Sequence, residues 1–264
     1  LTTKAIGFIK DHAEKPFFLN LWYYTVHTPI EPRKDKLEKY TAKAKSLGLD
    51  TSKPPAISEH QSLTNARQDN PAYAAMVESL DENVGRLMAE LDRLGLRENT
   101  IVVFFSDNGG LATGSHTRYP VCNLPLRAGK AWLYEGGIRT PFIVSWPARF
   151  QGGRTLETPV ISLDLLPTAL EAIGAAPPAG TVFDGKSLLP LLTGKSTRHH
   201  DTLYWSSGGL NGEWAVRQGD WKLHALRDQR ELINLAAKPA ETKNLAAQHP
   251  EKVKQLTALY HAWL

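Results

Sequence analysis

The sequence is poor in the features that mark several common protein classes. Its single cysteine, Cys122, excludes an internal disulfide framework and a cysteine-rich zinc site. No apolar run approaches the roughly 18 residues that cross a membrane, so we expect no membrane span. The formal net charge is only +4, without a long run of lysine and arginine, and this argues against nucleic-acid binding.

Familiar catalytic signatures are missing as well. The sequence has no G-x-S-x-G nucleophile elbow and no H-E-x-x-H zinc motif. A phosphate-binding loop is absent too, because Gly129 and Lys130 are followed by Ala131. Hydrolase and nucleotide-binding hypotheses that depend on these motifs therefore lose their support.

The composition is that of a globular protein. Hydrophobic residues make up 42% of the 264 positions and charged residues 22%. The sequence does not begin with methionine, and residues 1–12 resemble the interior of an amphipathic helix. We therefore expect an N-terminal part of the protein to be missing. We divide the chain into residues 1–196, an incomplete α/β domain, and residues 197–264, a C-terminal α+β subdomain.

Alternating helix and strand patterns predict the first of these units. Residues 16–26 are almost wholly apolar, which predicts a strand buried on both faces. Residues 70–94 carry an apolar stripe at helical spacing, with Asn70 as N-cap and Pro71 at the first helical position. A second apolar strand is predicted at residues 100–105. Helix, short turn and buried strand form the unit of a mostly parallel, doubly wound sheet.

Weaker patterns complete the outline. Further strands are predicted at residues 141–146 and 160–163, and a helix at residues 164–173. Four short segments then predict a small antiparallel sheet, at residues 203–205, 214–217, 221–224 and 231–233. A closing helix is predicted at residues 250–264. We expect the tryptophans at 205, 214 and 221 to fill the core of the small sheet.

Polar residues follow two of the predicted strands. Asp107 and Asn108 come just after residues 100–105, where open α/β sheets place their sites, and their oxygens suit Ca²⁺ or Mg²⁺. His27 follows residues 16–26 and could be a general acid or an anion contact. Lys130 could offer a charge to an anionic ligand. Each has a plainer alternative: Asp-Asn-Gly-Gly is a common turn, and the other two could be ordinary loop residues.

Two other groups of polar residues have a possible role. Glu135 and Arg139 lie four positions apart and could pair with each other. His199, His200 and Asp201 could bind a metal, although a solvated turn is the favoured interpretation of that segment.

The order of these segments resembles the type I, formylglycine-dependent sulfatases of the alkaline-phosphatase-like superfamily. The blocks that carry the resemblance are PFFLNLWYYTVHTP, YAAMVESLDENVGRLMAELDRLGLRENTIVVFFSDNGG and PLRAGKAWLYEGGIRTPFIVSWP, in this order. WAVRQGDWKLH and ELINLAAKPAETKNLA resemble the C-terminal subdomain of the family. The resemblance covers nearly the whole chain.

The resemblance implies a role for each candidate residue. Asp107 and Asn108 would bind the active-site Ca²⁺, with Mg²⁺ as the weaker alternative. Lys130 and Arg127 would contact the sulfate group, and His27 would contact sulfate and protonate the leaving oxygen. A cation, a lysine and a histidine would together stabilise the charge of the departing sulfuryl group. The implied substrate is a sulfated small molecule or glycan, and the implied location is periplasmic or secreted.

One departure from the family pattern limits this expectation. The nucleophile of the family is a formylglycine made within C/S-x-P-S-R, and that motif is absent from the sequence. We do not assign the nucleophile to Cys122. The parent protein is therefore expected to supply the formylglycine from a missing N-terminal portion, and this chain alone is predicted to be inactive. Two alternatives stay open: a phosphoesterase or phosphonate hydrolase of the same superfamily, and a non-catalytic anion- or glycan-binding derivative.

Overall fold

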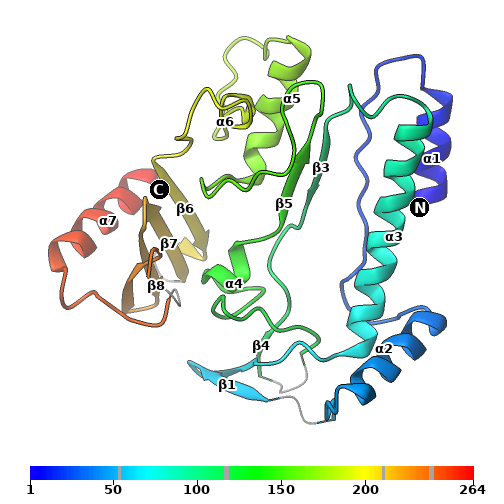
Figure 1. The fold of residues 1–264 in the computed structure, drawn as a ribbon. Coiled ribbons are helices and arrows are strands. Elements are labelled where there is room, and N and C mark those ends of the chain that lie inside the picture. Colours follow the sequence, from blue (N-terminus) through cyan, green and yellow to red (C-terminus); the bar gives the residue numbers. More distant parts are fainter. Residues whose placement is uncertain (53–54, 116–118, 210–211, 238–240) are drawn as a thin grey trace.

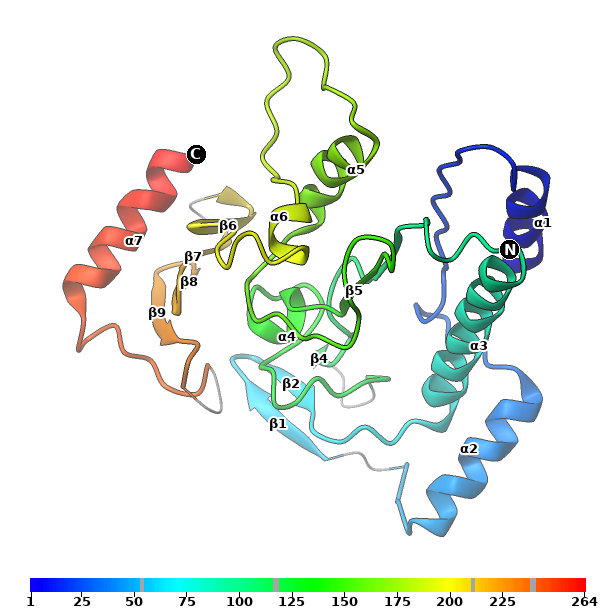
Figure 2. The ribbon, with the colours of Figure 1, turned by 45° about the horizontal axis from the view of Figure 1, so that its top comes forward.

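The chain forms two regions joined by a segment of short helices. A computed structural model describes residues 1–52, 55–115, 119–209, 212–237 and 241–264. Figure 1 shows three helices, α1 to α3, on one side, a pair of strands, β3 and β5, beside them, and the C-terminal sheet with α7 on the far side. In Figure 2 the segment with α4, α5 and α6 again lies between these two sides.

The helical side is built around the long helix predicted from the sequence. Helix α3 spans Pro71–Arg93, and helices α1, Thr2–Asp11, and α2, Lys34–Ser46, pack against it. The side chain of Asn70 caps α3 by accepting hydrogen bonds of 3.0 and 3.1 Å from the second and third helical N–H groups. The predicted helix and its N-cap are thus confirmed. None of the described helices is both long enough and apolar enough to cross a membrane.

The strands of the N-terminal region pair in two small sheets. β1, Ala56–Glu59, β2, Ser62–Asn65, and β4, Thr113–Gly114, form one sheet, and β3, Val102–Phe105, pairs with β5, Phe142–Ser145. Every strand pair among the described residues is antiparallel, so the predicted parallel pairs are not found within this part of the chain. Hydrophobic patterns predict burial, but they do not encode the direction of the neighbouring strand.

The strand predicted at residues 16–26 is not found. These residues are described, but they form no strand, and their side chains alternate between partly buried and exposed. Phe18 and Trp22 are each 80% exposed, and Tyr24 is 69% exposed. The segment therefore has the alternation of a half-buried strand without a hydrogen-bonded neighbour. An apolar run predicted burial on both faces, and the described part of the chain covers only one.

The structure of the C-terminal region confirms the sheet and helix predicted from the sequence. Its antiparallel sheet has the order β6-β7-β8-β9, with strands Thr202–Ser207, Glu213–Gln218, Trp221–Leu226 and Gln229–Asn234. Helix α7, Pro250–Trp263, packs across β7 and β8. The fully buried rings of Trp214 and Tyr260 stack at 4.1 Å between sheet and helix.

Three short α-helices and one 3₁₀ helix lie between the two regions. The helices are α4, Glu135–Ile138, α5, Leu165–Ile173, and α6, Leu189–Leu192. The strand predicted at residues 160–163 is wrong, because these residues form no strand and a 3₁₀ helix, Ser162–Asp164, begins within them. The Asp164 carboxylate accepts a hydrogen bond from the Ile161 N–H, which favours the tight turn over an extended chain.

Candidate functional site

His27 and Lys130 meet in the structure. His27 Nε2 lies 2.9 Å from Lys130 Nζ, across 103 positions of sequence. His27 Nδ1 lies 2.7 Å from the carbonyl oxygen of Thr28. A carbonyl oxygen only accepts, so Nδ1 carries the proton, and Nε2 of a neutral ring presents its lone pair to the Lys130 ammonium. Two residues chosen separately from the sequence therefore form one contact.

Asp107 and Asn108 lie directly after β3, as predicted. Asp107 is exposed, and within the described residues its carboxylate makes no hydrogen bond or ion pair. The Asn108 side chain donates from Nδ2 to the Gly109 carbonyl at 3.0 Å, which leaves its Oδ1 available. One carboxylate and one amide oxygen are hard ligands that suit Ca²⁺ or Mg²⁺, so these two residues fit part of such a site.

Close backbone packing joins this loop to the segment that carries Lys130. The Lys130 N–H donates to the Gly110 carbonyl at 3.0 Å, and the Gly109 N–H donates to the Gly137 carbonyl at 2.8 Å. A Cβ at position 109 would lie 1.8 Å from the Gly136 carbonyl oxygen, so only glycine fits there. The Asp107–Asn108 turn and Lys130 are therefore held in one unit.

Asn123 strengthens this unit, and no pattern in the sequence indicates its role. Its Nδ2 lies 2.9 Å from the Gly110 carbonyl oxygen and 3.1 Å from the carbonyl oxygens of Ala128 and Gly136. One amide thus bridges the loop after β3 and both ends of the Lys130 segment. Only the tertiary structure reveals this, because a lone asparagine in a loop has no characteristic pattern.

Arg127 has a different environment from the one predicted. Its guanidinium binds both oxygens of Glu59, at 2.7 to 3.0 Å, and Oε2 of Glu231 at 2.8 Å. It also lies over the Tyr134 ring, 3.9 Å from the centroid. Burial opposes the charge, but the Glu59 and Glu231 carboxylates raise the pKa of Arg127 above its usual value. These contacts occupy the guanidinium with protein groups and favour a positioning role over sulfate binding.

Glu135 does not pair with Arg139 as considered from the sequence. Instead, the fully buried Lys222 of β8 donates to Glu135 at 3.0 Å and to Glu241 at 2.8 Å. Arg139 lies 3.8 Å from Glu157 on the surface. Burial raises the pKa of Glu241. This cluster could not be predicted from the sequence, because its three members come from separate segments.

Besides the contacts of Arg127 and Glu135, a third contact joins the Lys130 segment to the C-terminal sheet, and it comes from β7. Glu213 accepts the backbone N–H of Leu133 at 2.8 Å, and its Oε1 lies 2.7 Å from Nε2 of the buried His224. Burial lowers the pKa of His224, so the ring is neutral and donates from Nε2 to Glu213. The His224 ring also lies 4.1 Å from the Tyr134 ring.

These three contacts hold residues 127–135, with Lys130 inside them, against the C-terminal sheet. Arg127, Leu133 and Glu135 are the anchored positions, and their partners lie on β9, β7 and β8 respectively. The C-terminal region therefore fixes the position of Lys130 without contributing a side chain to the His27–Lys130 contact.

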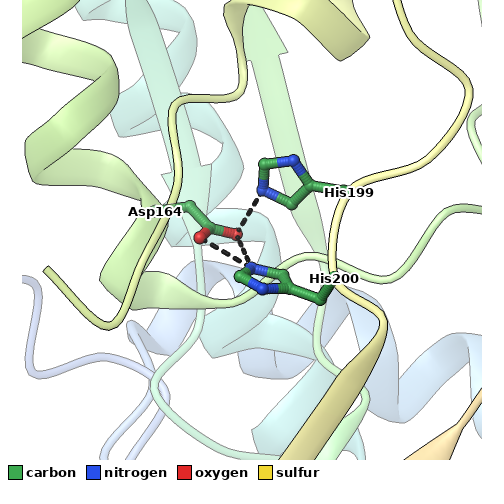
Figure 3. Close-up of side chains that lie close together, drawn as sticks. All are labelled: Asp164, His199 and His200. Carbon is green, nitrogen blue, oxygen red and sulfur yellow. Dashed lines mark hydrogen bonds and ion pairs between the residues drawn. The ribbon is translucent and has the colours of Figure 1, made fainter.

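The solvated turn predicted for His199, His200 and Asp201 is found only at Asp201. Figure 3 shows His199 and His200 directed at the carboxylate of Asp164. Both imidazoles are buried, with 5% and 6% of each side chain exposed, so the solvated turn favoured from the sequence is wrong for them. Asp201 lies outside the cluster and pairs with Arg198 on the surface. Asp164 was missed because it lies 36 positions from His200.

Comparison with known proteins shows which family the chain resembles. Sulfatases match residues 1–175, and the C-terminal region of N-sulphoglucosamine sulphohydrolases matches residues 128–262. A sulfatase of Formosa agariphila is 34% identical over 94% of this chain and 45% of its own length. An N-acetylgalactosamine-6-O-sulfatase of Bacteroides thetaiotaomicron is 29% identical over 98% of this chain and 49% of its own.

Solved structures agree. The crystal structure of Ps i-CgsB in complex with k-i-k-neocarrahexaose superimposes with a TM-score of 0.81 at 25% identity, over 99% of this chain and 53% of the other. The chain thus spans about half the length of these proteins. The predicted fold class, an α/β alkaline-phosphatase-like fold with a C-terminal antiparallel sheet and helix, is confirmed by the sulfatase structures that share it. The chain belongs to the sulfatase family.

Proposed function

We propose that the protein containing this chain hydrolyses sulfate esters. The observation that carries the proposal is the contact between His27 Nε2 and Lys130 Nζ, next to the loop that presents Asp107 and Asn108. A lysine, an imidazole and two free oxygen ligands at one place suit a tetrahedral oxyanion and the cation that accompanies it.

Each of the two side chains has a distinct task in this reaction. Lys130 turns its ammonium to a sulfuryl oxygen and stabilises the negative charge there. His27 keeps its Nδ1 proton on the Thr28 carbonyl, which holds the ring in one orientation. Its Nε2, which faces Lys130 with a lone pair in this structure, takes up a proton from solvent when the Lys130 ammonium moves to the sulfate, and it donates that proton to the leaving oxygen as the ester bond breaks.

Asp107 and Asn108 hold the metal ion in this proposal, and Ca²⁺ fits them better than a softer ion because both ligands are oxygens. When bound, the ion supplies Lewis-acid stabilisation of charge on the sulfate oxygens. Calcium takes about six to eight oxygen ligands, so further ligands come from elsewhere.

We propose that the missing ligands and the formylglycine nucleophile come from a part of the protein outside this sequence. Two observations support this: the relatives are about twice as long, and the sequence contains no C/S-x-P-S-R motif. The exposed aromatic side chains at residues 18, 22 and 24 offer a face that such a part would cover.

A sulfated carbohydrate is the proposed substrate class. The support comes from the relatives, one of which is named for an N-acetylgalactosamine 6-O-sulfate, while a structural neighbour holds a neocarrahexaose. Arg127 is assigned to positioning in this proposal, because its donors already bind Glu59 and Glu231.

The test uses the full-length protein and three matched aryl esters, a sulfate, a phosphate and a phosphonate. We expect kcat/KM to be highest for the sulfate and to fall when Asp107 is replaced by Ala. A preference for the phosphonate would identify a phosphonate hydrolase instead. Binding of a sulfated sugar without turnover of any ester would identify a non-catalytic derivative.

A further inference from the structure

A second group of ligand-type side chains lies away from the His27–Lys130 contact. The carboxylate of Asp164 is fully buried at the junction of the 3₁₀ helix and α5. His200 Nε2 lies 2.8 Å from its Oδ1 and 3.1 Å from its Oδ2, and His199 Nε2 lies 3.0 Å from Oδ2. Figure 3 shows both rings pointing at this carboxylate. One oxygen and two imidazole nitrogens lie within 4.8 Å of one another.

Hydrogen bonding leaves one member of this group unsatisfied. Asp164 already accepts backbone N–H groups, from Lys186 on Oδ1 at 2.8 Å and from Ile161 on Oδ2 at 2.9 Å. His199 Nε2 is buried and makes no aligned hydrogen bond, although Oδ2 is close to it. A buried polar atom without a partner is destabilising, so it calls for an explanation. A cation shared with Asp164 and His200 would provide one.

The chemistry of the three groups selects a class of ion. Two imidazole nitrogens and one carboxylate oxygen suit Zn²⁺ and similar transition metals, whereas Ca²⁺ and Mg²⁺ prefer oxygen ligands. A pocket of ≈ 140 Å³, lined by His200, Asp201 and Asp220 among others, lies beside the His200 member of the group.

We propose that Asp164, His199 and His200 bind one transition-metal ion of the zinc type, separate from the metal of the sulfate site. Asp164 begins α5, and the two histidines immediately precede β6. The ion therefore joins the α/β region to the first strand of the C-terminal sheet, and its role is structural. The proposal does not depend on the proposed sulfatase activity.

The test begins with the full-length protein, in which Asp107→Ala removes the other metal site. The protein is stripped with a chelator and titrated with Co²⁺, whose visible bands report nitrogen and oxygen ligands. We expect one Co²⁺ per chain, displaced by Zn²⁺, and two imidazoles in the X-ray absorption spectrum of the zinc form. Failure to bind a stoichiometric ion would overturn the site and identify a hydrogen-bonded triad.

Variants then assign the ligands. His199→Gln and His200→Gln should each weaken Zn²⁺ binding by more than the roughly 10–100-fold that loss of an outer-shell partner costs. His261→Gln, which changes an exposed histidine of α7, is the matched control and should bind as the parent does. Unchanged affinity in His199→Gln would overturn the proposal. The X-ray absorption result on the unaltered triad decides the question even if a histidine variant does not fold.

Discussion

His27 Nε2 lies 2.9 Å from Lys130 Nζ, and each residue is held by its own part of the backbone. The Thr28 carbonyl fixes the His27 ring through Nδ1, and the Gly110 carbonyl receives the Lys130 N–H. Neither contact requires the other, so the pair is preorganised by two independent loops. Preorganised charge and hydrogen-bonding groups are the main source of stabilisation for a developing oxyanion.

Lys130→Met should reduce kcat/KM of the full-length protein on an aryl sulfate by about 10²–10³, because it removes one preorganised charge from the sulfuryl oxygens. Lys254→Met is the control, since Lys254 is exposed on α7 and should leave the rate unchanged. Steady-state kinetics and a melting curve separate loss of activity from loss of folding. Full activity in Lys130→Met would remove this lysine from the mechanism.

His27→Gln should slow hydrolysis most for sulfate esters with poor leaving groups, because a weakly acidic alcohol needs a proton as it departs. The measurement is a plot of log kcat/KM against leaving-group pKa for a series of aryl and alkyl sulfates. We expect a steeper slope for His27→Gln than for the parent and for His261→Gln. Equal loss across the series would leave His27 as an anion contact only.

Lys222→Met should lower the free energy of unfolding by about 3–5 kcal/mol, because it leaves Glu135 and Glu241 as buried carboxylates without a cation. Adding Glu135→Gln and Glu241→Gln to the same protein should recover part of this loss. Urea unfolding measures both. A loss within 0.5 kcal/mol, typical of an exposed site, would show that the cluster does not stabilise the junction.

The pH dependence of stability should report His224. Burial lowers its pKa in the folded state below the usual 6.5, so the unfolded chain takes up a proton first as the pH falls. Its contribution to stability is therefore complete above about pH 6.5 and is lost progressively below it, by at most about 1.4 kcal/mol per pH unit for one site. His224→Gln should show a shallower slope between pH 5 and 7 than His261→Gln. Parallel slopes would contradict the pKa direction.

Residues 1–264 expressed alone should be inactive on aryl sulfates, even with added Ca²⁺, because no nucleophile is present in a recognisable setting. The polypeptide should also self-associate through Phe18, Trp22 and Tyr24, which are 69–80% exposed. Sedimentation measures association, and replacing the three side chains by Ser should reduce it. Metal-dependent turnover by this polypeptide would redirect attention to Cys122, and a monomer would show that the aromatic face needs no cover.

Local patterns determined much of this protein. The apolar stripe and N-cap of α3, the position of β3, and the four strands and helix of the C-terminal region follow from residues near one another in sequence. His27, Asp107, Asn108 and Lys130 could be selected because each follows or flanks such an element. The order of the blocks was enough to indicate the family.

Only the tertiary structure decided which side chains share a site. Arg127 binds Glu59 and Glu231, Lys222 binds Glu135, and Asp164 gathers two histidines. These partners are 35 to 104 positions apart, and local periodicity carries no information about them. The structure also decided the exposure of residues 16–26, because burial depends on what lies against a segment and not on its own composition.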